Sequence, residues 1–446
     1  MKPEELLSMC EKAVEEALKL GAGEAEAIAT WSRAVGVEVE KLQLKSARAH
    51  VEAGLGVRVA LGRKVGFSFT SHLTPDSIRK AAERAVEVAK AKPEDPLWPG
   101  LPGPAEPASV QGLYDPKAAE ATLEDAAELA RQMIEAMKVD ARVKAGSGGV
   151  GFAAHASAIA NSRGLALSAQ GTSAHASAYA VAEEAGDSSA GFEYEASRQA
   201  SDISPLRVGE AAGRMAVENL GKKSIETATM DVVLHPLALA SLLSIVTEEL
   251  SGENLYKKRT PLAGKLGEQV ASEELTLVDD GVLEKATRTW PFDAEGVPSR
   301  RTVLVERGVL KSFIFDRYWG KACGAESTGN ASRGYSSEPR IAPRNLVVEA
   351  GSKPLSELIS EVDEGMLVVD FMGTHTANIP SGDFSVVAYL PSYIKGGELK
   401  HPVKQAMISG NILDFIAKVD AVSREVKNLG RALLPYVRVR GVRVSA

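Results

Sequence analysis

The chain has 446 residues, of which 44% are apolar and 25% are charged. This composition is typical of a soluble globular protein, and the length is enough for two or three domains, each with its own core. The formal net charge of −7 disfavours a nucleic-acid-binding protein, because such proteins usually concentrate positive charge.

The N-terminal residues show helical and strand-like patterns in turn. Apolar side chains at helical spacing predict a helix over residues 3–20, and two strand-like runs follow at 25–39 and 46–61. A second helix is expected from Thr74 to Ala91, because a threonine followed by a proline is typical of an N-cap and the first helical position.

Residues 93–116 contain seven prolines, which predicts an extended surface connection. Beyond this connection, helices are expected over residues 123–138 and 206–220. The stretch 141–184 between them predicts a β-hairpin with its turn at Asn161-Ser-Arg-Gly164.

The pattern changes near residues 221–229, where we place a domain boundary. From Asp231 onward, many short strand-like runs surround one expected helix at 236–250. The sequence therefore predicts an α+β fold, with an N-terminal α+β domain over residues 1–224 and a mostly antiparallel-β domain over 225–446. The second domain is expected to be a sheet or a barrel-like sandwich.

The arginine-bearing tail, Val437-Arg-Val-Arg-Gly-Val-Arg-Val444, alternates with a period of two. This pattern predicts a strand whose valines face a core and whose arginines face solvent. We expect an edge strand here, because charged side chains on an edge also oppose aggregation.

Two cysteines, Cys10 and Cys323, are too few for a disulfide framework and match a reducing compartment. The start of the chain has acidic residues where a signal peptide would have positive charge and an apolar run. No apolar stretch of about 20 residues is available to span a bilayer. These features predict a cytoplasmic protein that does not bind membranes.

Gly146, Gly148 and Gly151 match the spacing of the dinucleotide-binding fingerprint. That fingerprint should open a helix and be followed about 20 residues later by an acidic residue. The residues that follow are small and strand-like, and the next acidic residue is Glu183. We therefore expect no nicotinamide or flavin cofactor.

The histidines are scattered. His155 and His175 each begin a His-Ala-Ser-Ala tetrapeptide, and we expect them on the faces of the hairpin, because no further metal ligand lies in that segment. His235 precedes a proline at a helix start, where a capping or packing role is usual. His375, in a polar loop, is the histidine retained as a possible cleft residue, whereas His401 has no evident ligand partner.

Glu248, Glu249 and Glu253 cluster at the end of the helix expected at 236–250 and just beyond it. A solvated helix end is the simplest interpretation, and we do not predict a metal site. Like charges at this end oppose the helix dipole, so a cleft or a partner's positive charge would offset that cost. Ser381 and Asp383 pair a hydroxyl with an acid, but no histidine is placed beside them by the sequence.

A series of ordered motifs fills the region from Ser251 to Ser385. They are Ser251-Gly-Glu253, Leu262-Ala-Gly-Lys-Leu-Gly-Glu-Gln-Val270, Val278-Asp-Asp-Gly281, Pro291-Phe-Asp-Ala-Glu-Gly-Val-Pro298, Val305-Glu-Arg-Gly-Val-Leu-Lys311, Ser327-Thr-Gly-Asn330 and Gly382-Asp-Phe-Ser385, with Gly54-Leu-Gly-Val-Arg-Val59 and Asn161-Ser-Arg-Gly164 upstream. Together they resemble the TldD/PmbA family of zinc peptidases over nearly the whole chain.

The chain departs from the TldD branch of this family at the metal site. Where that branch has His-Glu-x-x-x-His, this chain has Leu243-Ser-Ile-Val-Thr-Glu248, and leucine and serine do not supply zinc ligands. Where the branch has Cys-Gly-Lys-x-Gly-Gln, this chain has Asn428-Leu-Gly-Arg-Ala-Leu-Leu434 and no cysteine. Both departures match the PmbA (TldE) branch.

The resemblance implies a cytoplasmic, non-metal subunit that pairs with a zinc-holding, TldD-type His-Glu-x-x-x-His chain and acts on short unfolded peptides. Two alternatives stay open: a homodimer that binds peptides or a client protein without cutting them, and an independent hydrolase with an unrecognised site. No catalytic or metal residue and no cofactor is predicted in this chain. The residues that the resemblance places at a substrate cleft or interface are Glu248, Gly252, Glu253, Gly296, Thr328, Gly329, Asn330 and His375.

Overall fold

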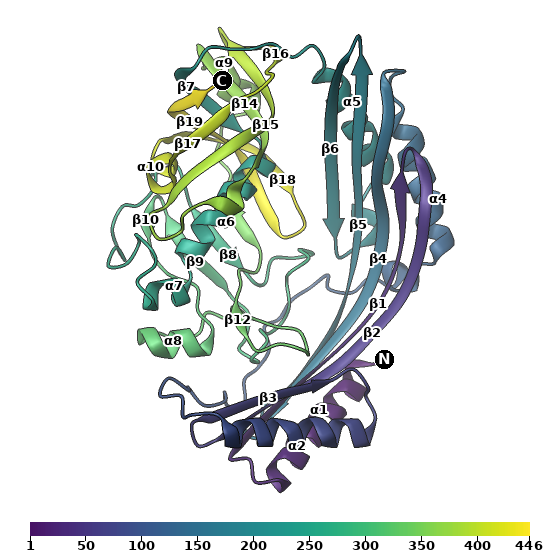
Figure 1. Cartoon of the computed structure of the whole chain (residues 1–446), viewed down its shortest axis with the longest axis vertical. Coiled ribbons are helices and arrows are strands. Elements are labelled where there is room, and N and C mark those ends of the chain that lie inside the picture. Colours follow the sequence, from purple (N-terminus) through teal and green to yellow (C-terminus); the bar gives the residue numbers. More distant parts are fainter.

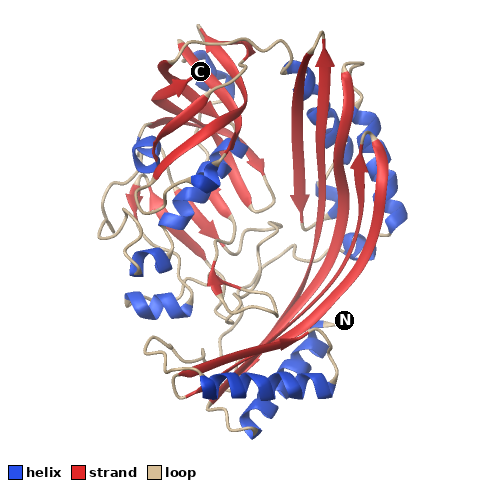
Figure 2. Ribbon diagram, in the orientation of Figure 1, coloured by secondary structure: helices blue, strands red, loops and turns tan.

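Six long antiparallel strands form one curved sheet in the order β3-β2-β1-β4-β5-β6 in the computed structural model, which describes residues 1–446 (Figures 1 and 2). Helices cover the convex face of this half-barrel, and its concave face is turned toward the C-terminal half of the chain. The strands are β1 Glu24–Glu40, β2 Gln43–Leu61, β3 Lys64–Thr70, β4 Val143–Asn161, β5 Ala166–Glu184 and β6 Asp187–Ser197. The helices are α1 Pro3–Lys19, α2 Pro75–Ala91, α3 Pro116–Glu120, α4 Leu123–Met137 and α5 Pro205–Glu218, with a 3-10 turn η1 at Ala200–Asp202.

The half-barrel contains the same unit twice, each unit being a helix, three antiparallel strands and a second helix. The first copy is α1-β1-β2-β3-α2 and the second is α4-β4-β5-β6-α5, and the two copies join where β1 pairs with β4. The second helix of each copy also packs closely against the third strand of that copy. A Cβ on Gly66 of β3 would lie 2.1 Å from the Ala85 carbonyl oxygen, and a Cβ on Gly191 of β6 would lie 2.1 Å from that of Ala212.

The sequence-based expectations for this half are largely confirmed. The helices at 3–20, 74–91, 123–138 and 206–220 are present with ends shifted by a few residues. Residues 141–184 form the β4–β5 hairpin, and Thr74 caps α2 by accepting a hydrogen bond from the Ser77 N–H. Gly146 to Gly151 lies inside β4 with no helix after it, so the strand–turn–helix setting of the dinucleotide fingerprint is not there.

The C-terminal half is built around a small closed barrel. Strands β7, β14, β15, β17 and β19 form the ring, which closes because β19 pairs with both β17 and β7. The predicted α+β fold with a β-rich C-terminal part is therefore confirmed. The strands are β7 Ala228–Leu234, β8 Leu277–Asp280, β9 Arg301–Glu306, β10 Val309–Leu310, β11 Ala331–Ser332, β12 Arg340–Ile341, β13 Leu346–Val348, β14 Glu364–Met372, β15 Asp383–Lys395, β16 Glu398–Pro402, β17 Met407–Asn411, β18 Val419–Asn428 and β19 Ala432–Ser445. The helices are α6 Pro236–Glu249, α7 Gly252–Tyr256, α8 Arg317–Cys323, α9 Leu355–Ser360 and α10 Ile412–Ala417, with a 3-10 turn η2 at Thr374–Thr376.

The edge-strand prediction for the arginine-bearing tail was wrong. The tail is part of β19, which is hydrogen-bonded on both sides within the barrel. Its valines face the core as expected, but Arg438 is buried as well, at 2% exposure. Its guanidinium forms ion pairs with Asp420 and Glu361, both at 2.8 Å. A central strand can therefore contain this charged residue, because two acidic side chains compensate its charge.

The chain passes from the half-barrel to the barrel between α5 and β7, and both termini lie on the outside of the molecule (Figure 1). Loops of the C-terminal half return to the concave sheet and bind it through buried ion pairs, such as Arg58 with Glu295 at 3.1 Å. No helix of the chain combines the length and the apolar character that a membrane crossing requires.

The packing of α5 on β6 is tested by Gly191→Ala. The added methyl group would meet the Ala212 carbonyl oxygen at 2.1 Å and the Ala216 nitrogen at 2.5 Å, so the helix must move. We expect a loss of about 1–3 kcal/mol in stability and a melting temperature lower by several degrees. The matched control is Gly410→Ala in β17, where nothing lies within 4 Å and little change is expected. Equal melting temperatures for the two variants would contradict this packing.

Candidate functional site

A cleft of about 570 Å³ opens between α6, the edge strand β6 and two turns of the C-terminal half. We call it the α6 cleft. One turn connects β18 with β19 and the other follows β8. The cleft is lined by Phe192, Tyr194, Leu237, Ala240, Ser241, Ser244, Thr287, Arg288, Asp370, Thr374, Leu429, Arg431 and Ala432.

Helix α6 presents two different faces. Leu243 and Val246 point into the apolar core of the barrel and are 5% and 2% exposed. Ser241 and Ser244, three residues apart on the same side, line the cleft. Ser241 Oγ donates a hydrogen bond to Asp370 Oδ1 on β14 at 2.6 Å, which fixes both polar groups at the cleft wall.

The start of α6 is set by the cap that the sequence predicts. His235 Nδ1 accepts a hydrogen bond from the Leu237 N–H at 3.1 Å, and Pro236 occupies the first helical position. Burial lowers the pKa of His235 to about 3, so its imidazole is neutral and available as an acceptor. The predicted capping role of His235 is confirmed.

The two turns that complete the cleft are tied to each other. The Thr287 N–H donates to the Gly430 carbonyl at 2.9 Å, and the Arg288 N–H donates to Asn345 Oδ1 at 3.1 Å. Gly430 has a φ of +77°, which a glycine adopts without strain. These bonds hold Arg288 and Arg431 beside each other at the cleft.

The two segments in which the sequence departs from the TldD branch, residues 243–248 and 428–434, thus meet at one cleft in this chain. Ser244 lines it from α6 and Leu429 lines it from the β18–β19 turn, one residue before Gly430-Arg431. Leu243 is turned into the core, and Glu248 is exposed. A hydroxyl and two aliphatic side chains do not fit a zinc ion. Nowhere in the chain do three or more His, Cys, Asp or Glu side chains gather as a metal site would require.

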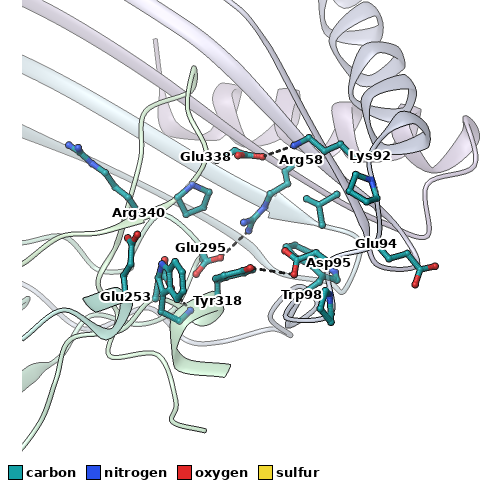
Figure 3. Close-up of a pocket in the computed structure, with 16 residues that line it drawn as sticks. Arg58, Lys92, Glu94, Asp95, Trp98, Glu253, Glu295, Tyr318, Glu338 and Arg340 are labelled. Atoms are coloured by element: carbon teal, nitrogen blue, oxygen red, sulfur yellow. Dashed lines mark hydrogen bonds and ion pairs between the residues drawn. The ribbon is translucent and has the colours of Figure 1, made fainter. Parts of the chain in front are cut away.

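A second cavity of about 610 Å³ lies at the other end of the sheet, between the Pro-rich connection and α7–α8 (Figure 3). Arg58 and Glu295 point toward each other across it, and Tyr318 lies beside Asp95. Asp316 is 2% exposed and caps α8 by accepting from the Trp319 N–H at 2.8 Å. Burial, and then repulsion from Glu295, raises the pKa of Asp316 to about 7.

The residues assigned to a cleft by resemblance do not line one common cavity. Glu253 lines the second cavity, where its side chain pairs with Lys257. Glu248 and His375 are exposed elsewhere on the surface. The other five are tightly packed: Gly252, the first residue of α7, against Phe315, Gly296 against Leu165, Thr328 and Asn330 in a hydrogen-bonded pair at 2.6 Å, and Gly329 in a left-handed turn.

The expectation of a solvated helix end needs correction at Glu249. Glu249 is fully buried rather than solvated, and burial raises its pKa to about 7. His155 does face the concave side of the hairpin, where it stacks on Trp290 and contacts Arg198. Ser381 Oγ donates to Asp383 Oδ2 at 2.7 Å, and Asn411 is the next hydrogen-bond partner of that carboxylate.

Sequence reasoning missed Ser241, Asp370, Arg288 and Arg431 as cleft residues. One signal was available for α6, because Ser241 and Ser244 interrupt an otherwise apolar helix on one face. The two arginines follow strand-like segments about 140 residues apart, and only the fold brings their turns together.

Three successive parts of the chain match models of the PmbA/TldA metallopeptidases: domain 1 over residues 25–89, the central domain over 116–220 and the C-terminal domain over 227–446. The chain is 26% identical to metalloprotease PmbA of Escherichia coli O157:H7, covering 97% of this chain and 96% of that protein. It is also 26% identical to a metalloprotease TldD homologue of Buchnera aphidicola, covering 87% and 83%. The crystal structure of TldE from Thermococcus kodakarensis superposes with a TM-score of 0.92 at 28% identity, covering 98% of this chain and 100% of that chain.

The fold, a half-barrel facing a small closed barrel, is thus one found among metallopeptidases. The chain belongs to the PmbA/TldD family, as its motifs between Ser251 and Ser385 predict.

Asp316 gives the second cavity a measurable pH dependence. A buried acid with a raised pKa stabilises the folded state while it is protonated, so its contribution is complete below about pH 4 and is lost as the pH rises through about 7. Asp316→Asn keeps an N-cap but cannot ionise. We expect this variant to melt at a higher temperature than the wild type at pH 8, with a smaller difference at pH 5.

The matched control is Asp115→Asn, the same substitution at the N-cap of α3. Scanning fluorimetry across pH 4–8 measures both variants. A difference between Asp316→Asn and the wild type that does not grow with pH would show that this carboxyl group is not held protonated by the fold.

Proposed function

We propose that this chain is the non-metal, PmbA/TldE-like subunit of a cytoplasmic zinc peptidase whose zinc is held by a TldD-type partner. The supporting observation is the α6 cleft itself. It unites the two segments that would carry metal ligands, but places Ser244 and Leu429 there and turns Leu243 into the core. A chain that has the cleft without the zinc ligands is suited to bind the peptide, whereas the zinc-dependent hydrolysis requires ligands from another chain.

The cleft has the features of a site for an extended peptide. Strand β6 is the last strand of the half-barrel and pairs only with β5, so its other edge has free main-chain donors and acceptors. Phe192 and Tyr194 of this strand line the cleft. An unfolded peptide can add to such an edge through main-chain hydrogen bonds while its side chains enter the cleft. A peptide in extended conformation can pair along the whole of this edge, which supports short unfolded substrates.

Pairing with a chain of the same fold is supported by the duplicated half-barrel. Two related chains can associate about a pseudo-two-fold axis, because matching surfaces meet each other. The partner would supply the zinc-bound water that attacks the peptide carbonyl. The residues of this chain would orient the peptide through β6 and α6.

One alternative is a homodimer that binds peptides without cutting them. It is favoured by the fact that the α6 cleft is formed entirely within one chain, so peptide binding does not require a partner. An independent hydrolase has less support, because Ser381 and Asp383 are hydrogen-bonded to each other and to Asn411 rather than to a histidine.

The proposal is tested by purifying the chain alone and together with a TldD-type chain from the same source. Alone, it should contain no stoichiometric zinc by elemental analysis and should not cleave an unfolded peptide. The mixture should co-purify and cleave the peptide in a chelator-sensitive way. Steady cleavage by this chain alone would contradict the proposal, and co-purification only with itself would favour the peptide-binding homodimer.

A triple substitution, Leu243→His with Ser244→Glu and Glu248→His, tests whether the position of the zinc motif is sufficient. We expect at most weak zinc binding, because Leu243 is 5% exposed and points into an apolar core, and no cysteine stands in the β18–β19 turn. A buried imidazole should also lower the melting temperature. The control is the pair Ser244→Glu and Glu248→His, which leaves the core intact. Tight zinc binding by the triple variant would show that a further ligand exists in the cleft.

A further inference from the structure

The α6 cleft contains two arginine side chains without an acidic partner. Arg288 and Arg431 both line it, and neither forms an ion pair within the chain. By contrast, Arg438 and Arg440, which follow in β19, are both paired with Asp420. Burial, and then repulsion from Arg431, Arg344 and Arg340, lowers the pKa of Arg288, in agreement with the position of Arg288 and Arg431 at one cleft.

The acidic group of the cleft does not balance them. Asp370 is the one carboxylate among the lining residues, so one negative charge stands against two positive charges. Its Oδ1 accepts hydrogen bonds from Ser241 Oγ at 2.6 Å and from the Phe371 N–H at 2.7 Å. Two guanidinium groups therefore face a half-enclosed space in a protein whose net charge is −7. Such a space attracts an anion.

The backbone at both arginines is held in place. The Thr287 N–H donates to the Gly430 carbonyl, and the Arg288 N–H donates to Asn345 Oδ1. Asn345 is fully buried. The two turns thus form one rigid support, which reduces the entropy cost of binding a ligand between the guanidinium groups.

We infer that Arg288 and Arg431 bind a carboxylate group of a peptide that lies in the α6 cleft. This inference rests on the proposed function, in which the cleft receives an unfolded peptide. A guanidinium group matches a carboxylate in shape and donates two parallel hydrogen bonds to it. Leu237, Leu429 and Phe192 line the same cleft, so the neighbouring peptide residues would be apolar. The carboxylate comes either from the C-terminus of the peptide or from an acidic side chain.

Four fluorescein-labelled hexapeptides distinguish these sources. Their sequence is Ala-Leu-Xaa-Leu-Ala-Leu, with Xaa either glutamate or glutamine and the C-terminus either a free acid or an amide. Fluorescence anisotropy with the full chain measures each dissociation constant at low salt and in 0.5 M salt, a concentration that screens exposed charges (roughly a 4 Å Debye length). We expect one of the two carboxylates to tighten binding by about 10- to 100-fold, as charge-assisted hydrogen bonds do.

The preference should disappear in Arg288→Gln and Arg431→Gln, and it is measured for each variant as the ratio of the dissociation constants of the neutral and the carboxylate-bearing peptide. Arg431→Lys retains the positive charge but cannot donate two parallel hydrogen bonds to one carboxylate. We therefore expect this variant to keep only part of the preference. The matched control is Arg84→Gln, another exposed arginine without an ion pair, on α2. Circular dichroism verifies that each variant is folded.

The outcomes separate this inference from the proposed function. If all four peptides bind equally well, or if Arg431→Gln retains the preference, the proposed carboxylate site is contradicted. The proposal that the α6 cleft binds peptides is then still supported. If no peptide binds to the chain, alone or with a TldD-type partner, both are wrong.

Discussion

The buried carboxylate of Glu26 holds the two halves of the molecule together. It lies on β1 at 0% exposure, and it pairs with Arg58 of the neighbouring strand and with Arg333 of the C-terminal half. Arg58 also binds Glu295 at 3.1 Å, so one network joins the concave sheet to the loops that face it. Removing one partner from such a network typically costs about 3–5 kcal/mol, because a buried charge is left alone.

This network determines where the cavities lie. It fixes the loops around Glu295 and Arg333 against one end of the sheet, which creates the wall of the second cavity (Figure 3). At the other end, the barrel meets the sheet at its edge strand, where Lys427 of β18 pairs with Glu193 of β6 at 2.6 Å. The α6 cleft lies between these attachments. A rigid frame therefore surrounds an open space whose walls come from both halves of the chain.

Local patterns were enough to predict the helices and hairpins, because their signals are local. Thr74-Pro75 and His235-Pro236 mark helix starts in the sequence, and both act as caps in the structure. The closure of the barrel was not predictable in this way. A period of two indicates a strand but not its neighbours, so Arg438 was assigned to solvent although Asp420 and Glu361 meet it in the interior.

The duplication of the helix–three-strand–helix unit was also not predictable from the sequence. It depends on small residues such as Gly66 and Gly191, which are needed where a helix approaches a strand, and two glycines do not constitute a visible repeat. The candidate site was predictable only through the resemblance to a family. Ser244 and Leu429 are 185 residues apart in sequence, by their numbering, and lie in one cleft because α6 and the β18–β19 turn pack on the same barrel.

The burial of Leu243 determines how well position 243 could accept a metal ligand. At this position the side chain packs with Val246 and Phe415 and helps to fill the barrel core, so its present role is structural. An imidazole there would remove apolar contacts and bury a polar ring without a partner. The neighbouring Ser244, in contrast, is exposed and free to change. The apolar core thus opposes a metal ligand at position 243, whereas the exposed face of α6 at Ser244 can accept other side chains without a loss of core packing.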